Sequence, residues 1–319
     1  MINSSRGERG EVMILTVCMS PSMDVTIELD SLNVGKTNAV KSKAISLGGK
    51  ALNVAIGVAR LGGEVYATGL MYQENGQLFE NMLAKEGVPF SFVWNKGRVR
   101  ENYKFIDNRS MLTEINDIGQ EIELGKAQEI LSMVHKFSAQ SSVTVLSGGI
   151  PRGVEDRYYG NLAQAVSTNS LRIVDTVGQR MFYALNQGVD LVKPNLEELE
   201  NALGKRIADK ADMLAACYEL LDRGAKSVLL SLGKQGAVIT DGTKTYYCKS
   251  INVAMNSTVG AGDGMVAASA MLLERCAPLD EILRAGVAAG TATVMTVGRT
   301  SFTKEKYNEV LANLKVKTL

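Results

Sequence analysis

Hydrophobic and polar positions along this chain follow two periods that take turns. Short apolar runs at residues 13–17, 143–146 and 171–175 are typical of buried strands. Segments of helical length and period, such as residues 126–137 and 210–223, lie between such runs. Strands that alternate with helices indicate an α/β protein with a mostly parallel central sheet and helices on both of its faces.

Two parts of the chain, residues 24–47 and 90–116, do not fit this alternation. Their apolar and polar residues alternate at period two, which is typical of strands with one exposed face. We expect these parts to form a small β-sheet that projects from the edge of the main sheet. Residues 13–319 are expected to form one domain, and the polar residues 1–12 a disordered N-terminal tail.

The charge balance of the chain is close to even. Its 319 residues include 35 basic and 34 acidic side chains, so neither nucleic acid nor a membrane surface is expected as a partner. The uncharged residues 285–298 are too few, and too rich in Gly and Thr, to span a bilayer. Four cysteines without a C-x-x-C pair and a single histidine argue against a zinc site and a disulfide framework, and favour a cytoplasmic location.

A glycine-rich turn runs directly into an apolar segment late in the chain. Gly260 and Gly262 flank Ala261, and glycine lets backbone amides crowd toward one point. The helix that follows adds unpaired N–H groups and the positive end of its dipole, which favours a bound phosphate. Asp263 would be repelled there unless it accepts a proton from a nucleophile that attacks the phosphate. The alternative is that Asp263 only caps the helix.

A second glycine turn, at Gly48 and Gly49, also precedes a helix. Its exposed amides, together with Lys50 and Asn53, would hold an anionic or hydroxyl-rich ligand. The alternative is an ordinary tight turn between a strand and a helix.

Three polar side chains, Arg100, Asn102 and Lys104, fall on one face of an expected strand. They could hold a phosphate together, or they could simply form a solvated strand face.

Asn195 and Glu198 stand three residues apart at the start of a helix, which brings them onto one face. They could hold Mg²⁺ through water, or form a capping box, and the two roles are compatible. After the next strand, Ser231, Gly233 and Gly236 offer a backbone turn suited to a nucleotide.

Two common nucleotide-binding motifs are absent. The stretch that ends in Gly35-Lys36-Thr37 has Asp30 where a P-loop requires its first glycine. The Gly260-x-Gly262 stretch has Met265 where the dinucleotide-binding motif requires its third glycine. A P-loop enzyme and a Rossmann dehydrogenase are therefore disfavoured.

Taken together, these stretches resemble the pfkB (ribokinase-like) carbohydrate kinases from residue 13 to the C-terminus. Residues 259–263 (Val-Gly-Ala-Gly-Asp) resemble the family's C-terminal signature and residues 48–55 its N-terminal one, with the Lys-Pro-Asn of residues 193–195 between them. Within the family, residues 100–104 and 147–153 are most similar to 1-phosphofructokinases and tagatose-6-phosphate kinases. The resemblance implies a β-sheet lid and phosphorylation of a ketohexose monophosphate by Mg-ATP: fructose 1-phosphate first, tagatose 6-phosphate as the alternative.

The resemblance also implies a role for each candidate residue. Asp263 would be the catalytic base, and the amides of Gly260, Ala261 and Gly262 would stabilise the transferring phosphoryl group. The sugar phosphate would be held by Asp24, Gly48, Gly49, Lys50, Asn53, Arg100, Asn102 and Lys104. ATP would be held by Lys193, Asn195, Ser231, Gly233, Gly236 and Ala289, while Asn195 and Glu198 would organise Mg²⁺ through water.

Three positions depart from the family pattern: Ser20, Ala51 and Gly264 replace the usual asparagine, glycine and serine. A homodimer through the lid is a further expectation. A non-catalytic sugar-phosphate sensor remains an alternative, although such a protein would be expected to lose Asp263 or the glycine turn.

Overall fold

The computed structural model describes residues 13–109, 111–253, 259–296 and 301–319; the expected tail, residues 1–12, lies outside them. The described residues form a ten-stranded sheet and a separate four-stranded sheet. In spatial order the large sheet runs through β14 (Val316–Thr318), β13 (Thr245–Cys248), β12 (Ala237–Thr240), β11 (Val228–Ser231), β10 (Leu191–Val192), β9 (Leu171–Asp175), β8 (Ser141–Ser147), β1 (Met13–Cys18), β4 (Val65–Tyr72) and β5 (Phe90–Asn95). In this spatial order, all neighbours from β10 and β11 at one end to β4 and β5 at the other pair in parallel. Strands β12, β13 and β14 add an antiparallel edge next to β11.

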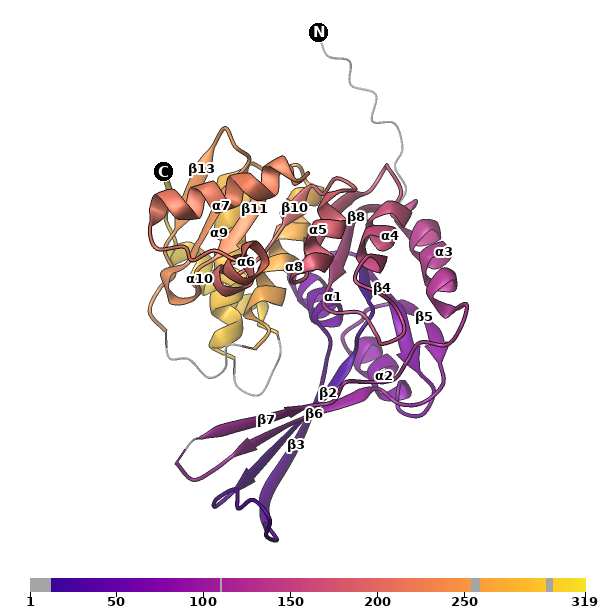
Figure 1. Ribbon diagram of the computed structural model, residues 1–319. Coiled ribbons are helices and arrows are strands. Elements are labelled where there is room, and N and C mark those ends of the chain that lie inside the picture. The colour runs from indigo at the N-terminus through magenta and orange to yellow at the C-terminus, as the bar shows by residue number, and fades with distance from the viewer. Residues whose placement is uncertain (1–12, 110, 254–258, 297–300) are drawn as a thin grey trace.

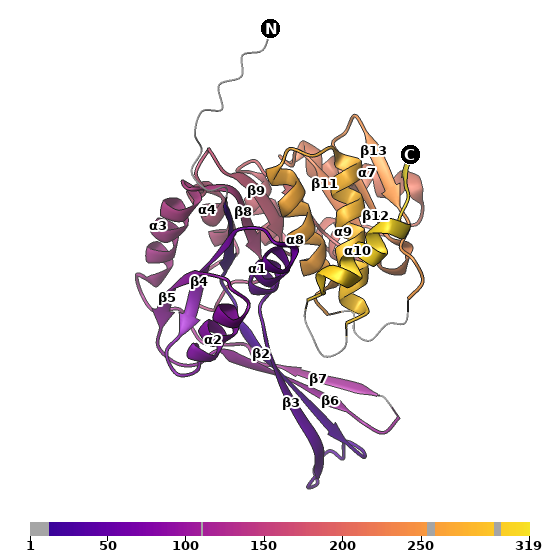
Figure 2. The same cartoon turned by 180° about the vertical axis from the view of Figure 1, so that it is seen from behind.

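Helices cover both faces of the large sheet. One layer holds α3 (Lys126–Ser138), α4 (Tyr158–Ala165), α5 (Gln179–Leu185) and α7 (Lys210–Asp222) (Figure 1). The opposite layer holds α1 (Lys50–Leu61), α8 (Ala261–Glu274), α9 (Leu279–Val294) and α10 (Lys304–Asn313) (Figure 2). Further short helices are α2 (Gln77–Lys85), α6 (Leu196–Leu203) and a 3₁₀ turn at Gly233–Gln235. The predicted α/β class with helices on both faces is confirmed.

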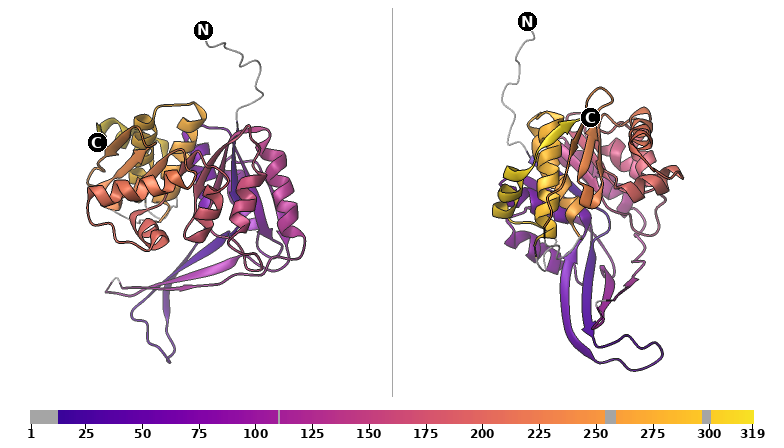
Figure 3. Two further views of the ribbon diagram at one scale, coloured as in Figure 1. Left: turned by 45° about the horizontal axis from the view of Figure 1, so that its top comes forward. Right: turned by 90° about the vertical axis from the view of Figure 1, so that its left-hand side faces the viewer.

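The four-stranded sheet stands away from the main body in every view (Figures 1 and 3). Its order is β3 (Val40–Gly48), β2 (Ser22–Leu29), β6 (Arg100–Ile106) and β7 (Leu112–Asn116). The expected range 90–116 was wrong at its start, because β5 pairs in parallel with β4 in the large sheet. An edge strand of the main sheet also has one exposed face, so its period-two pattern does not distinguish the two locations.

Other differences from expectation concern short elements. The helix expected at residues 153–167 begins only at Tyr158, since Gly153 has a positive φ of 87° and cannot continue a helix. The seven-residue α5 and the three-residue β14 were not predicted, because neither is long enough to show a clear period.

No helix among the described residues is long and apolar enough to cross a membrane. Cys18, Cys217 and Cys248 are free and buried, and Cys276 is exposed.

Candidate active site

The candidate residues gather at the carboxyl end of the parallel strands. Parallel strands end at the same edge of a sheet, and ligands of open α/β sheets bind there. Ser147 ends β8, Asp175 ends β9 and Lys193 directly follows β10. The N-termini of α1 and α8, which carry the two glycine turns, lie at the same end and pack against each other (Figure 2).

Asp263 lies in the first turn of α8 and is only 5% exposed. Gly260 is the N-cap residue, with a φ of 82° that favours glycine, so the turn can direct its amides to one point. The residues before Val259 in this turn, 254–258, lie outside the described part of the chain. Asp263 Oδ2 accepts a hydrogen bond of 2.7 Å from Asn53 Nδ2 of α1, which brings the two glycine turns together.

Burial and the nearby Asp175 carboxylate raise the pKa of Asp263 to about 6. This value lies close to neutral pH, where a carboxylate can both accept a proton and release it again. The Asp263 side chain bonds to Asn53 of α1, and among the described residues it makes no capping bond at the start of α8, so the capping alternative loses support.

Asp175 was not among the predicted site residues, yet it joins two of them. Its Oδ2 lies 3.5 Å from Lys50 Nζ, and its Oδ1 lies 3.2 Å from Lys193 Nζ. Burial alone would raise the pKa of Asp175, but the Lys193 and Lys50 ammonium groups outweigh it and hold that pKa below its ordinary value. In return, Asp175 and then Glu198 raise the pKa of Lys50. The available signal in the sequence was a buried strand that ends on a carboxylate.

Lys193 is 3% exposed and reaches the glycine turn of α8. A Cβ atom added at Gly262 would lie 3.2 Å from Lys193 Nζ, so any larger residue there would crowd this lysine. A buried cation therefore stands beside the backbone amides of residues 260–262. This arrangement suits an anion that carries more than one charge.

Asn195 and Glu198 form the capping box that was one of their two predicted roles. The Asn195 side chain accepts from the Glu198 N–H at 2.8 Å, and Glu198 Oε2 accepts from the Asn195 N–H at 2.9 Å. The second oxygen, Glu198 Oε1, lies 3.6 Å from Lys50 Nζ. Lys50 thus bridges the Asp175 and Glu198 carboxylates.

The Asp175 and Glu198 carboxylates are candidates for holding the expected Mg²⁺. Among the described residues no three His, Cys, Asp or Glu side chains gather as a cage for a metal ion. Asp175 Oδ1 is nevertheless buried with no well-aligned hydrogen bond among the described residues, and its close charged contact is the Lys193 ammonium at 3.2 Å. Carboxylate oxygens suit Mg²⁺, which keeps several waters and takes few protein ligands, so the donor set fits an ion that ATP brings with it.

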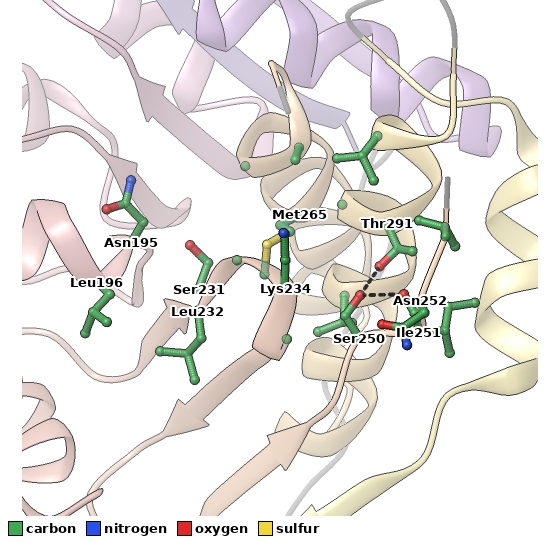
Figure 4. Close-up of a pocket in the computed structure, with 18 of the residues that line it drawn as sticks. Asn195, Leu196, Ser231, Leu232, Lys234, Ser250, Ile251, Asn252, Met265 and Thr291 are labelled. Atoms are coloured by element: carbon green, nitrogen blue, oxygen red, sulfur yellow. Dashed lines mark hydrogen bonds between the residues drawn. The ribbon is translucent and has the colours of Figure 1, made fainter. Parts of the chain in front are cut away.

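A cavity of about 660 Å³ opens beside the Gly262 turn. Asn195 and Ser231 lie on one side of it, and Ser250 and Thr291 on the other, hydrogen-bonded to each other at 3.1 Å (Figure 4). Its walls contain the predicted Asn195, Ser231, Gly233, Gly236, Ala261 and Gly262, together with the unpredicted Lys234, Ser250, Asn252, Met265 and Thr291. Ala289 does not line the cavity, because it is fully buried in the core with its carbonyl against Gly264.

The polar residues predicted on the small sheet do share one face. The β2–β6 register pairs Asp24 with Asn102 and Thr26 with Lys104. Asp24 accepts hydrogen bonds from Asn102 Nδ2 at 3.0 Å and from Lys104 Nζ at 3.1 Å. Arg100, opposite Ser22, makes one long hydrogen bond of 3.5 Å to the Asp117 carbonyl, while its Nε is buried without an acceptor among the described residues.

Gly48 and Gly49 lie where β3 passes into α1, and Gly49 has a φ of 138°. The departure at Gly264 has a packing reason: a Cβ atom there would lie 2.6 Å from Thr293 Oγ1 of α9. The closely packed α8–α9 pair therefore excludes the serine usual at this position.

Known proteins support this picture. The family model described as pfkB family carbohydrate kinase matches residues 13–306. A tagatose-6-phosphate kinase of Staphylococcus epidermidis is 29% identical over 308 residues, covering 95% of this chain and 99% of its own. A 1-phosphofructokinase of Xanthomonas campestris is 32% identical over 278 residues, covering 83% of this chain and 87% of its own.

Solved structures agree with these sequence matches. Phosphofructokinase-2 of Escherichia coli, in complex with substrates and products, matches with a TM-score of 0.84 and 28% identity, covering 95% of this chain and 99% of its own. Its tetrameric inhibited form matches with a TM-score of 0.86, at the same identity and coverage. The chain belongs to the pfkB family of carbohydrate kinases and is a phosphotransferase.

Proposed function

We propose that this protein transfers the γ-phosphoryl group of Mg-ATP to a ketohexose monophosphate, fructose 1-phosphate, and forms fructose 1,6-bisphosphate. The observation that carries the proposal is the buried Asp263 carboxylate at the N-terminus of α8. It lies in the first turn after Gly260, where the backbone amides would face a bound phosphate, and Asn53 holds it in place. A carboxylate beside a phosphate site is chemically useful when it accepts a proton.

In this mechanism Asp263 accepts the proton of the attacking sugar hydroxyl. The hydroxyl oxygen forms a bond to the γ-phosphorus, the bond from that phosphorus to the ADP oxygen breaks, and ADP leaves with that electron pair. The amides of residues 260–262 and the Lys193 ammonium stabilise the charge on the transferring group. Mg²⁺ would neutralise the phosphates of ATP, with Asp175, Asn195 and Glu198 close enough to hold its waters.

The cavity beside Gly262 is the proposed ATP site. Its mixed polar and apolar walls and its opening toward the amides of residues 261 and 262 suit a nucleotide whose phosphates end at α8. The adenosine would lie between the 231–236 turn and the residues around Thr291 (Figure 4).

Tagatose 6-phosphate is the second candidate substrate. The supporting observation is the S. epidermidis tagatose-6-phosphate kinase, which this chain matches over 99% of that protein's length. Both candidates are ketohexose monophosphates, and the polar face of the small sheet would hold either phosphate. The non-catalytic sensor is disfavoured because Asp263, Gly260 and Lys193 are all in place.

The small sheet also supports the proposed homodimer. Its register puts Ile45, Val25, Tyr103 and Ile115 in one row on the face opposite Asp24. Ile45 and Ile115 are more than half exposed, at 53% and 56%. Apolar side chains on the outer face of a projecting sheet are typical of a subunit contact. The same sheet would then close over the sugar with its polar face.

A panel of three phosphates tests the proposal: fructose 1-phosphate, tagatose 6-phosphate and fructose 6-phosphate, each with Mg-ATP and coupled detection of ADP. We expect the highest kcat/KM with fructose 1-phosphate. A higher value with tagatose 6-phosphate would select the second candidate. Tight binding of these compounds without any ADP release would support the sensor instead.

A further inference from the structure

Arg180, near the start of α5, differs from other partly buried arginines in what its side chain contacts. Within the described residues, the Nε atoms of Arg100, Arg172, Arg180 and Arg284 are buried without a hydrogen-bond acceptor. Arg172 and Arg284 donate from their terminal nitrogens to backbone carbonyls at 2.7–3.2 Å. Arg180 makes no hydrogen bond in the part of the chain that the structure describes; its one close polar contact is Asp156 Oδ1, 3.3 Å from Nε.

The guanidinium group of Arg180 approaches the loop that follows β8. A Cβ atom added at Gly149 would lie 3.2 Å from Arg180 Nη1 and 3.8 Å from Ser20 Cβ. One residue earlier, a Cβ atom at Gly148 would lie 3.6 Å from Lys50 Cβ. Arg180 therefore contacts the loop that follows β8 at Gly149, close to Ser20, and Lys50 lies against the preceding Gly148.

Arg100 approaches the same region from the other direction. It is the register partner of Ser22 in β2, two residues beyond Ser20. The loop of residues 19–21 thus has Arg100 on its small-sheet side and Arg180 on its α5 side. Both guanidinium groups retain N–H donors that no described residue accepts, apart from the 3.5 Å bond of Arg100 to Asp117.

We propose that Arg180 is a substrate-binding residue that donates to the phosphate already present on the sugar, opposite Arg100. A guanidinium group can bind two phosphate oxygens at once through its planar fork. The inference rests on the proposed function, since it needs a phosphorylated sugar as substrate. It assigns a role to a position that no motif in the sequence marked, and a side chain at Gly149 would crowd Arg180 Nη1.

Asp156 is the one carboxylate that contacts Arg180, and its side chain is 50% exposed. A half-exposed carboxylate at this distance screens the Arg180 charge only weakly. It holds the Nε edge of the guanidinium group and leaves the terminal nitrogens directed toward Gly149 and Ser20.

The test compares binding of fructose 1-phosphate and tagatose 6-phosphate, by calorimetry, to the wild type and to Arg180→Met, Arg180→Lys and Gly149→Ala. Arg180→Met should raise the Kd of the preferred phosphate by roughly 10–100-fold, as expected for the loss of a charged hydrogen bond. The Kd of ATP should stay within about twofold. Arg180→Lys should give a smaller rise, because lysine keeps the charge but not the fork.

Gly149→Ala probes the same contact without touching the arginine. Gly149 does not have a positive φ, so its backbone accepts alanine, while the added Cβ displaces Arg180 Nη1. A rise in the Kd of the sugar phosphate, smaller than for Arg180→Met, is expected. Arg157→Met is the matched control for the loss of an arginine charge, since Arg157 is 70% exposed and pairs with the exposed Glu155 rather than with the Gly149 loop; its Kd values should equal those of the wild type.

A further comparison separates the phosphate from the sugar. Fructose and tagatose without phosphate should be phosphorylated equally poorly by the wild type and by Arg180→Met. If Arg180→Met reduces phosphorylation of the free sugars by the same factor as phosphorylation of the sugar phosphates, Arg180 only maintains the structure of the site. This result would overturn the proposal. An unchanged Kd in both Arg180→Met and Gly149→Ala would overturn it as well, while the proposed kinase activity would stand.

If the wild type binds none of the three sugar phosphates, both proposals fail together. If Arg180→Met does not fold, as shown by its melting curve, Arg180→Lys and Gly149→Ala carry the test.

Discussion

The end of the main sheet and the small sheet hold similar side chains in opposite surroundings. Around Asp263, the carboxylate of Asp175 is fully buried and Lys193 is 3% exposed. On the small sheet, the paired side chains of Lys104 and Asp24 are 18% and 15% exposed, and apolar Ile115 on the opposite face is 56% exposed. Burial strengthens every charge interaction in the first region, whereas solvent weakens those in the second.

This difference suggests a division of labour between the two regions. In the proposed mechanism the main sheet fixes the groups that act on the phosphoryl group, and packing leaves them little freedom. The small sheet would contribute the side chains that select the sugar phosphate. Substitutions in the first region should therefore change kcat, and substitutions in the second should change substrate affinity or assembly.

The largest expected effect is that of Asp263→Asn. Asparagine keeps the size of the side chain but cannot accept the proton, so kcat should fall by roughly 10²–10⁴-fold. Folding should not suffer. The folded-state pKa of about 6 lies above the ordinary value of 3.8, so the carboxylate lowers the stability of the fold progressively as the pH rises from 3.8 to about 6, and the full loss persists above pH 6. Thermal melts at pH 7.5 should show a Tm at or above that of the wild type; kcat above about a tenth of wild type would place the base elsewhere.

Lys193→Met should follow, with kcat lower by roughly 10²-fold, the scale for losing one donor to the transition-state charge. The substitution also leaves the buried Asp175 with Lys50 as its nearby cation, which costs stability. Lys234→Met is the control, because Lys234 lines the cavity away from Asp175. Equal losses of kcat in both variants would contradict the special position of Lys193.

Lys104→Met tests the second region. Loss of one charged hydrogen bond should raise the Kd of the sugar phosphate by about 10–100-fold, with the affinity for ATP unchanged. If the affinity for ATP falls instead, the polar face of the small sheet does not belong to the sugar site. Lys43→Met, on the opposite face of the sheet, is the matched control.

Ile115→Lys should have the smallest effect on chemistry. A charge on the exposed apolar face should shift the protein toward monomer in analytical ultracentrifugation, while the Tm changes by little because Ile115 is 56% exposed. Asn116→Lys adds the same charge on the opposite face of β7 and should leave the assembly unchanged. A wild-type protein that is monomeric at all concentrations would contradict the proposed dimer.

Local sequence predicted the parts of this molecule that depend on local rules. The turn at Gly260 and the box of Asn195 and Glu198 could be recognised because glycine conformation and helix capping involve only near neighbours. The registers of β2 and β6 followed the expected alternation, and Arg100, Asn102 and Lys104 did share a face.

Long-range pairing was not predictable in the same way. Asp175 meets Lys50 and Lys193 only because β9 lies between β8 and β10 in the sheet, which no local pattern specifies. Arg180 reaches Gly149 through an arrangement of α5 against β8 that is equally remote in sequence. The misplacement of β5 has the same origin, because an alternating strand does not encode which sheet it joins.

The most direct test of the central claim is the pH dependence of phosphoryl transfer in a single turnover, which removes product release from the measured rate. With Asp263 as the base and its pKa raised to about 6, the rate should climb about tenfold per pH unit below that value and level off above it. The residual rate of Asp263→Asn should not show this rise with pH. A wild-type rate that stays constant from pH 5 to pH 7, each value about one unit from that pKa, would contradict the assignment of Asp263 as the base.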